Sequence, residues 1–122
     1  MSKSFSLDAI KQDSGVGLYI DSADKHLEAI GYTEHNVRHA TRVSETARQI
    51  LSELRYPEKD VVLAGVAGYI HDIGNFLGRK NHDQMGALLA KDILDDFNIS
   101  IADSIRIMAA IGSHESEGVE IH

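Results

Sequence analysis

The chain has 122 residues and a mass of 13.4 kDa, enough for one hydrophobic core and not for two, so we expect residues 1–122 to form a single domain. Nineteen acidic against twelve basic residues give a net charge of −7, which disfavours nucleic-acid and anionic-membrane partners. The absence of cysteine excludes disulfides, thiolate metal sites and a cysteine nucleophile. No apolar run approaches the ~18 residues that cross a bilayer and the first residues lack a signal-peptide core, so we expect a cytoplasmic protein.

Helical periodicity dominates the first half of the chain. Apolar positions in 18–30 recur at three- and four-residue intervals, and Gly31 offers a C-terminal stop. Thr33 can cap a second helix, whose apolar face covers 37–54 and which ends before Pro57. Both stretches are predicted to be helices with one buried face.

A third helix is predicted to be central and buried. Pro57 suits its first turn, the run Val61–Ile70 is apolar nearly all round, and Gly74 closes it. By periodicity alone this run could also be a buried strand, but its alanines and glycines favour a helix.

Two more helices come after a loop over 75–80. Asn81 can cap the first, and Ser100 with Asp103 has the spacing of a capping box that opens the second, which we expect to end at Gly112. Their predicted inner faces are Met85, Leu88, Leu89, Ile93, Leu94 and Phe97, then Ile105, Met108, Ala109 and Ile111. No alternating strand pattern is convincing. The predicted fold class is therefore all-α, a bundle of five or six helices.

Histidine is the unusual residue, because seven occur where average usage gives roughly two or three. His71 and Asp72 are adjacent at the end of the most buried helix, where an ionised carboxylate needs a cation or hydrogen-bond donors. A metal ion can be that partner, since imidazole and carboxylate both bind Zn, Mn, Fe or Ni; a capping carboxylate beside a core histidine is the alternative. His39, His82 and His114 lie near the ends of neighbouring helices, where bundle packing could bring them together.

These residues fall in an ordered pattern: His39-Ala-Thr-Arg42-Val43, then His71-Asp72-Ile73-Gly74, then His82 and His114. The pattern resembles the HD superfamily of metal-dependent phosphohydrolases over roughly 31–118, and the stretches 31–39 and 68–75 look like a bacterial subgroup of it. The resemblance implies that His39, His71 and Asp72 bind a first divalent metal ion (Mn, Fe, Zn, Ni or Co), while His82 and His114 hold a second ion to which Asp72 bridges. Water activated by one or both ions would then attack a small phosphate ester, such as a nucleotide.

Several cations could contact such a substrate. Asp72, Arg79 and Lys80 are our predicted catalytic residues, the two cations as phosphate contacts, although a solvated loop explains Arg79 and Lys80 equally well. Arg42 could also face the site, or form a surface ion pair with Glu45. Among the remaining histidines, His35 is interpreted as structural, and His26 and His122 as surface residues.

Two departures from the family pattern matter. Asn75 stands where several phosphodiesterase members carry lysine, which weakens a cyclic-dinucleotide phosphodiesterase assignment. The family pattern also closes with an aspartate downstream of the His114 region; Asp103 precedes His114 and cannot replace it. Either the native protein continues beyond His122, which we expect, or the first metal lacks one protein ligand.

The residues support three hypotheses about function. The first is hydrolysis of a small phosphorylated substrate; the second keeps the enzyme but makes it a di-iron oxygenase; the third is a non-catalytic ligand-binding domain that retains the scaffold. The sequence leaves a homo-oligomer open, and it does not identify the substrate or the metal.

Overall fold

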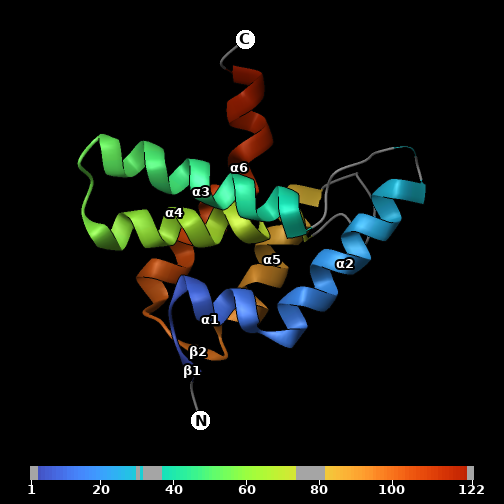
Figure 1. The fold of residues 1–122 in the computed structure, drawn as a ribbon, viewed down its shortest axis with the longest axis horizontal. Helices are drawn as coiled ribbons and strands as arrows, with labels where there is room; N and C mark the ends of the chain where they lie inside the picture. The colour runs from blue at the N-terminus through green and yellow to red at the C-terminus, as the bar shows by residue number, and fades with distance from the viewer. Residues whose placement is uncertain (1–2, 30, 32–36, 74–81, 121–122) are drawn as a thin grey trace.

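The computed structural model describes residues 3–29, 31, 37–73 and 82–120, with the side chains of 82–83 and 113–120 left aside. The described helices are α1 (Leu7–Gln12), α2 (Ser14–Ala29), α3 (Val37–Glu53), α4 (Glu58–Ile70), α5 (His82–Leu94) and α6 (Ile101–Glu120). Two short strands, β1 (Lys3–Ser4) and β2 (Phe97–Asn98), complete the described elements. The prediction of an all-α bundle is confirmed (Figure 1).

Helix α4 is the centre of the bundle, as predicted. Its buried residues lie on all sides of the helix: Val61, Leu63, Gly65, Val66, Ala67, Tyr69 and Ile70. Helix α3 runs along it in the opposite direction, and α1 and α6 also pack against it (Figure 1). Pro57 is the N-cap of α4 rather than a residue of its first turn, because its ψ of 149° is extended. His71 and Asp72 come directly after this buried helix, and their side chains are each 16% exposed.

The N-terminal segment contains structure that the periodicity did not predict. Ser6 caps the short helix α1 by accepting a hydrogen bond from the Ala9 N–H at 3.0 Å. Asp13 does the same for Val16 at 3.1 Å, so α2 begins at Ser14, four residues earlier than expected. Strand β1 pairs in parallel with β2, Lys3 opposite Phe97. Capping side chains, rather than an apolar repeat, therefore define these elements.

Some predicted inner faces are wrong. Leu88 is 60% exposed, and Phe97 belongs to β2 rather than α5, buried where its ring meets that of Phe5 edge to face. Ile105 of α6 is exposed as well. Helix α6 does not end at Gly112 but continues to Glu120, since a glycine ends a helix only where it leaves the helical conformation.

The apolar stripe of α3 is also less buried than its periodicity suggests. Ile50 and Leu54 are 51% and 63% exposed, whereas Ala40 and Ser44 are buried. The fully enclosed residues of α3 are therefore small, whereas Ile50 and Leu54 point largely into solvent. Leu18 on α2 is likewise exposed, although Ile20, Ala23 and Leu27 are buried as expected. In the described part of the chain, no helix has the length and apolar character needed to cross a membrane.

Candidate metal centre

The ends of two antiparallel helices bring His39, His71 and Asp72 together. His39 lies in the first turns of α3, and His71 and Asp72 come directly after the last residue of α4. Because the two helices run in opposite directions, the start of α3 lies beside the end of α4 (Figure 1). Side chains that are 32 residues apart in the sequence, His39 and His71, thus become neighbours.

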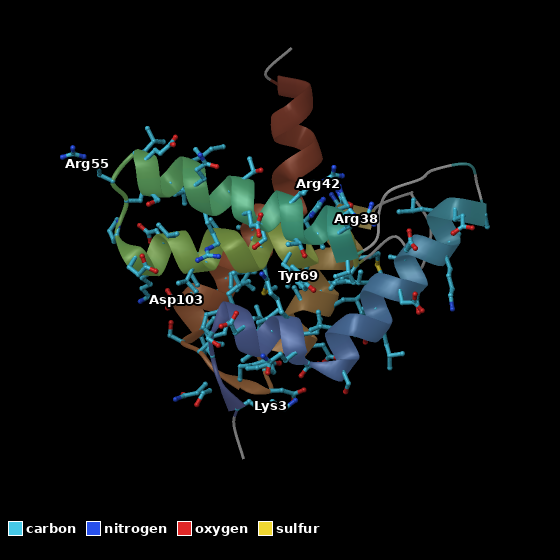
Figure 2. All side chains as sticks on the ribbon, viewed as in Figure 1. Lys3, Arg38, Arg42, Arg55, Tyr69 and Asp103 are labelled. Carbon is cyan, nitrogen blue, oxygen red and sulfur yellow. The ribbon has the colours of Figure 1, made fainter. Side chains whose placement is uncertain are left out.

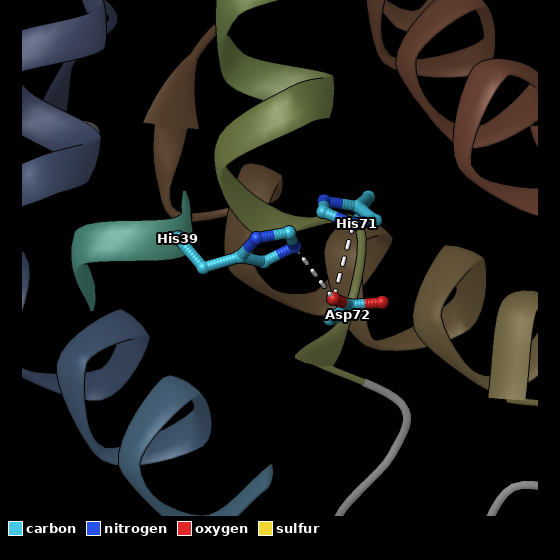
Figure 3. A group of neighbouring side chains, drawn as sticks. All are labelled: His39, His71 and Asp72. Atoms are coloured by element: carbon cyan, nitrogen blue, oxygen red, sulfur yellow. Dashed lines mark ion pairs between the residues drawn. The ribbon is translucent and has the colours of Figure 1, made fainter. Parts of the chain in front are cut away.

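The three side chains point at a common centre (Figure 3). Asp72 Oδ2 lies 3.0 Å from His71 Nε2 and 3.4 Å from His39 Nε2. The two imidazole rings are 5.5 Å apart between centroids and tilted by 56°. Each residue offers one ligand atom, and these atoms all lie within 4.8 Å of one another. Two nitrogens and one carboxylate oxygen therefore form one face of a coordination shell.

The donor set fits a first-row divalent metal ion. Zinc binds histidine nitrogen at 2.0–2.1 Å, so adjacent ligands of a tetrahedral ion are roughly 3.4 Å apart. The observed separations of 3.0 and 3.4 Å from Asp72 Oδ2 are close to that spacing. Imidazole and carboxylate are also the ligand types that Zn, Mn, Fe and Ni accept. The side chains are 16–25% exposed, which leaves the centre sheltered but open to a small molecule.

The tautomer of His71 is fixed by the backbone of α4. His71 Nδ1 donates a hydrogen bond to the carbonyl oxygen of Gly68 at 2.6 Å, because a carbonyl can only accept. In the neutral ring the lone pair is therefore on Nε2, the atom that faces Asp72 and His39. Such a hydrogen bond from the second ring nitrogen is the usual partner of a metal-binding histidine.

The charge balance of the cluster raises the pKa of His71 above its ordinary value. Burial lowers this pKa, but the hydrogen bond and negative charge of Asp72, together with the Gly68 carbonyl, raise it by more. Compared with an ordinary histidine, His71 therefore holds its second proton more tightly beside the Asp72 carboxylate. A bound cation would replace that proton, because a metal ligand must be the neutral imidazole.

Two hollows adjoin the cluster. A small apolar pocket lies on the side of α2, lined by Ile20, Ala23, Ala40, Tyr69 and Ile73 together with the three cluster residues. An open groove of about 540 Å³ runs from His39 along α3 and is lined by Arg42, Val43, Thr46, Ala47 and Ile50. The groove, and not the small pocket, has room for a substrate beside the cluster.

Most of the other predicted site residues have no described side chain. Arg79, Lys80, Asn75 and His35 lie outside the described residues. His82 begins α5 and His114 lies within α6, but their side chains are not among those described. The expectation that His114 comes after the end of the last helix is wrong, since α6 continues past it.

Two charged residues near the predicted site are placed by their own side chains. Asp103 is remote from the cluster, as expected, because it pairs with Lys59 at 3.0 Å beside the other end of α4 (Figure 2). Arg42 lines the groove with His39, and in the described regions it has no ion pair with Glu45 or any other carboxylate. The surface ion pair considered for Arg42 is thus not observed.

Sequence reasoning missed two residues that shape the cluster, Gly68 and Ser44. Gly68 supplies the carbonyl that holds His71, and Ser44 Oγ, fully buried, donates to the carbonyl of Gly65 at 2.8 Å. The signal for Gly68 was its position three residues before His71, in the last turn of a helix, where carbonyls lack intrahelical partners.

An all-α bundle with a His-Asp pair at the end of its central helix defines a class of metal-binding helical proteins. The family model for the HD domain matches residues 36–121, and the chain belongs to the HD domain family. Neither the curated proteins nor the solved structures give a significant match to this chain. HD domains are generally metal-dependent hydrolases of the phosphohydrolase superfamily.

Proposed function

We propose that this protein is a metal-dependent phosphohydrolase that acts on a small phosphate ester, with nucleotides as the first class to test. The observation that carries the proposal is the convergence of His39, His71 and Asp72 at the α3–α4 junction of an HD domain. The net charge of −7 argues against a polyanionic substrate such as a nucleic acid, because repulsion grows with the number of phosphates.

His39, His71 and Asp72 would hold the ion through Nε2, Nε2 and Oδ2. A bound divalent ion supplies a Lewis acid for phosphoryl oxygens and lowers the pKa of a coordinated water toward neutrality. The protein's own residues orient the ligand atoms and balance the charge of the site. Gly68 keeps the lone pair of His71 directed at the centre, and Asp72 offsets positive charge there. His82 and His114 remain our proposed ligands for a second ion.

Arg42 is the described cation best placed to contact the substrate. It lies one turn after His39 on the same side of α3, and both residues line the groove. A guanidinium can donate two parallel hydrogen bonds to a phosphate, and Arg42 has no carboxylate partner among the described residues that would compete for it. The apolar side chains of Val43, Ala47 and Ile50 would then lie against the organic part of the ester. Arg79 and Lys80 remain proposed phosphate contacts from the segment after α4.

The experiment is a metal titration combined with a substrate panel. The protein is stripped with a chelator, reloaded with Mn²⁺, Co²⁺, Zn²⁺ or Fe²⁺, and assayed for phosphate release from phosphomonoesters and phosphodiesters, nucleotides included. Loss of the hydrogen-bond partner of a metal ligand weakens metal binding by roughly 10–100-fold. Asp72→Ala removes a ligand itself, so metal binding should weaken by more than this, and turnover should disappear with it. Asp103→Asn is the matched control, because it changes a carboxylate that pairs with Lys59 away from the cluster.

The outcomes separate the hypotheses. Metal binding and phosphate release, both abolished by Asp72→Ala and both retained in Asp103→Asn, support the proposal. Metal binding without turnover on the whole panel would instead support a ligand-binding domain, and oxygen consumption by the iron form would support the oxygenase. Failure of the wild-type protein to bind any of these ions would remove the basis of the proposal.

A further inference from the structure

The backbones of α3 and α4 are in contact at Gly68. A Cβ atom at this position would lie 3.2 Å from both the carbonyl oxygen and Cγ1 of Val43, and 3.3 Å from Cα of Ser44. These distances are shorter than ordinary carbon contacts, which begin near 3.5 Å. Two of the three atoms belong to the backbone of α3, so a methyl group at position 68 requires that backbone to shift by a few tenths of an ångström.

Gly65 lies one turn earlier on the same side of α4, but it faces a side chain of α3 rather than its backbone. A Cβ there would lie 2.7 and 2.8 Å from Cδ and Cγ of Arg48. Those atoms belong to the long, half-buried side chain of Arg48, and the next atom, Cδ2 of Leu7 at 3.4 Å, is also a side-chain atom. No backbone atom of α3 is among the three nearest to Gly65, and side chains can adjust their rotamers. The two glycines therefore offer the same substitution in the same helix with different consequences for the spacing of α3 and α4.

The contact at Gly68 lies one helical turn from the cluster on both helices. Val43 is four residues after His39 on the same side of α3. Gly68 is three residues before His71, the C-cap of α4, and Asp72 follows His71 directly. A change in the distance between α3 and α4 at Gly68 would therefore also change the distance between His39 Nε2 and Asp72 Oδ2, which is 3.4 Å. The buried hydrogen bond from Ser44 to Gly65 holds α3 in the same register.

Gly68 also acts on the second histidine. Its carbonyl lies in the last turn of α4, where intrahelical partners run out, and it accepts the hydrogen bond of His71 Nδ1 at 2.6 Å. One residue thus sets the distance to His39 through its missing side chain and the tautomer of His71 through its backbone.

We propose that Gly68 is the positioning residue of the metal centre: it sets the approach of His39 to Asp72 and orients His71, without contacting metal or substrate. The inference shares one assumption with the proposed function, namely that the cluster binds a divalent ion. It adds that the affinity for this ion depends on the distance between α3 and α4.

The test compares Mn²⁺ binding by wild type, Gly68→Ala, Gly65→Ala and Gly17→Ala, each first stripped of metal. Gly68→Ala should bind Mn²⁺ about 10–100-fold more weakly, the range found when groups that orient ligands are altered. Gly65→Ala should stay close to wild type, since only side chains, chiefly that of Arg48, must move. Gly17→Ala on α2, where a Cβ meets no atom within 4 Å, controls for the general effect of replacing a helical glycine. Thermal unfolding of the metal-free proteins separates the loss of affinity from a loss of fold.

A second variant keeps the test decisive if Gly68→Ala does not fold. Val43→Ala removes Cγ1 of Val43, one of the three crowding atoms, so the double variant Gly68→Ala, Val43→Ala should tolerate the new methyl group better. It should still bind Mn²⁺ more weakly than Val43→Ala alone, because the backbone atoms remain. Equal affinity of these two variants, or wild-type affinity of a folded Gly68→Ala, would overturn the inference. So would an equal loss of affinity in Gly65→Ala.

The hydrogen bond from His71 Nδ1 to the Gly68 carbonyl can be tested separately in the wild-type protein. Nitrogen-15 NMR of the zinc-loaded protein should show His71 with a proton on Nδ1. A proton on Nε2 would contradict the assignment. If wild type binds neither Mn²⁺ nor Zn²⁺, the proposed function fails; if it binds them and Gly68→Ala binds them equally well, only the role of Gly68 fails.

Discussion

The α3–α4 pair and the α5–α6 pair of this bundle are packed in different ways. Helices α3 and α4 meet backbone to backbone at Gly68 and share a buried hydrogen bond from Ser44. Helices α5 and α6 meet through apolar side chains, with Ala90 and Leu94 on one helix and Ile107 and Ile111 on the other all buried. Between the latter pair, a Cβ at Gly112 would lie at an ordinary 3.7 Å from Ala87.

The two kinds of contact have different roles: the α5–α6 contact mainly stabilises the fold, and the α3–α4 contact positions the side chains of the cluster. Apolar side chains contribute stability roughly in proportion to the area they bury, and they tolerate small shifts. A backbone contact buries less surface, but it fixes a distance, and it is found where the donor atoms of His39 and Asp72 must approach. We therefore expect substitutions between α5 and α6 to lower the free energy of unfolding, and substitutions between α3 and α4 to lower mainly the affinity for the metal ion.

The largest effect on stability is expected for Leu94→Ala. Leu94 is fully buried at the end of α5, so its truncation should lower the free energy of unfolding by about 2–5 kcal/mol through lost burial and the cavity left behind. Urea denaturation of the metal-free protein measures this change. The folded variant should bind Mn²⁺ like wild type; a large loss of affinity would show that the two helix pairs are not separable.

A smaller change in stability is expected for Ser44→Ala. Loss of its hydrogen bond to the Gly65 carbonyl should lower the free energy of unfolding by about 0.5–1.5 kcal/mol. Because this bond keeps α3, which carries His39, in register with α4, Mn²⁺ affinity should fall as well. Ser104→Ala, at a buried serine on α6, is the control and should leave metal binding unchanged. Identical metal affinities for the two serine variants would contradict the division between a positioning pair and a stabilising pair of helices.

The smallest effect concerns acid stability and Asp103, far from the cluster. The hydrogen bond from Lys59 lowers the pKa of Asp103, desolvation opposes the shift, and the Ser100 hydroxyl and the charges of Lys59 and Arg106 add to the lowering. A lowered pKa in the folded state means that ionised Asp103 stabilises the fold above its unfolded value near 3.8, and that this contribution is lost as the pH falls through the folded pKa. The stability difference between wild type and Asp103→Asn should therefore shrink below about pH 4. A difference that grows on acidification would contradict this sign.

Much of the architecture could be predicted from the chain because it depends on local patterns. The all-round apolar run Val61–Ile70 predicted a central helix, and Ser100 predicted the start of α6, where its hydroxyl accepts the Asp103 N–H at 3.1 Å. Elements held by contacts distant in sequence were missed. Strand β1 exists because it pairs with β2, more than 90 residues later, and Phe97 is buried by that pairing rather than by a helical face.

The candidate site divides in the same way. His39, His71 and Asp72 were recognisable from residue type, order and a family resemblance, and the structure brings them together. Their separations, the tautomer of His71 and the place of Gly68 were not recognisable, because each depends on how closely two helices approach.

The sequence by itself determined the helical class, the central position of α4 and which residues are candidate metal ligands, because periodicity and residue type are local properties. Only the tertiary structure decided which side of α3 is buried and how near His39 comes to Asp72. The physical reason is that α3 approaches α4 most closely at Gly68, where the backbones are in contact, and at Ser44, whose hydroxyl donates to the Gly65 carbonyl, rather than through the large apolar residues that dominate the sequence pattern.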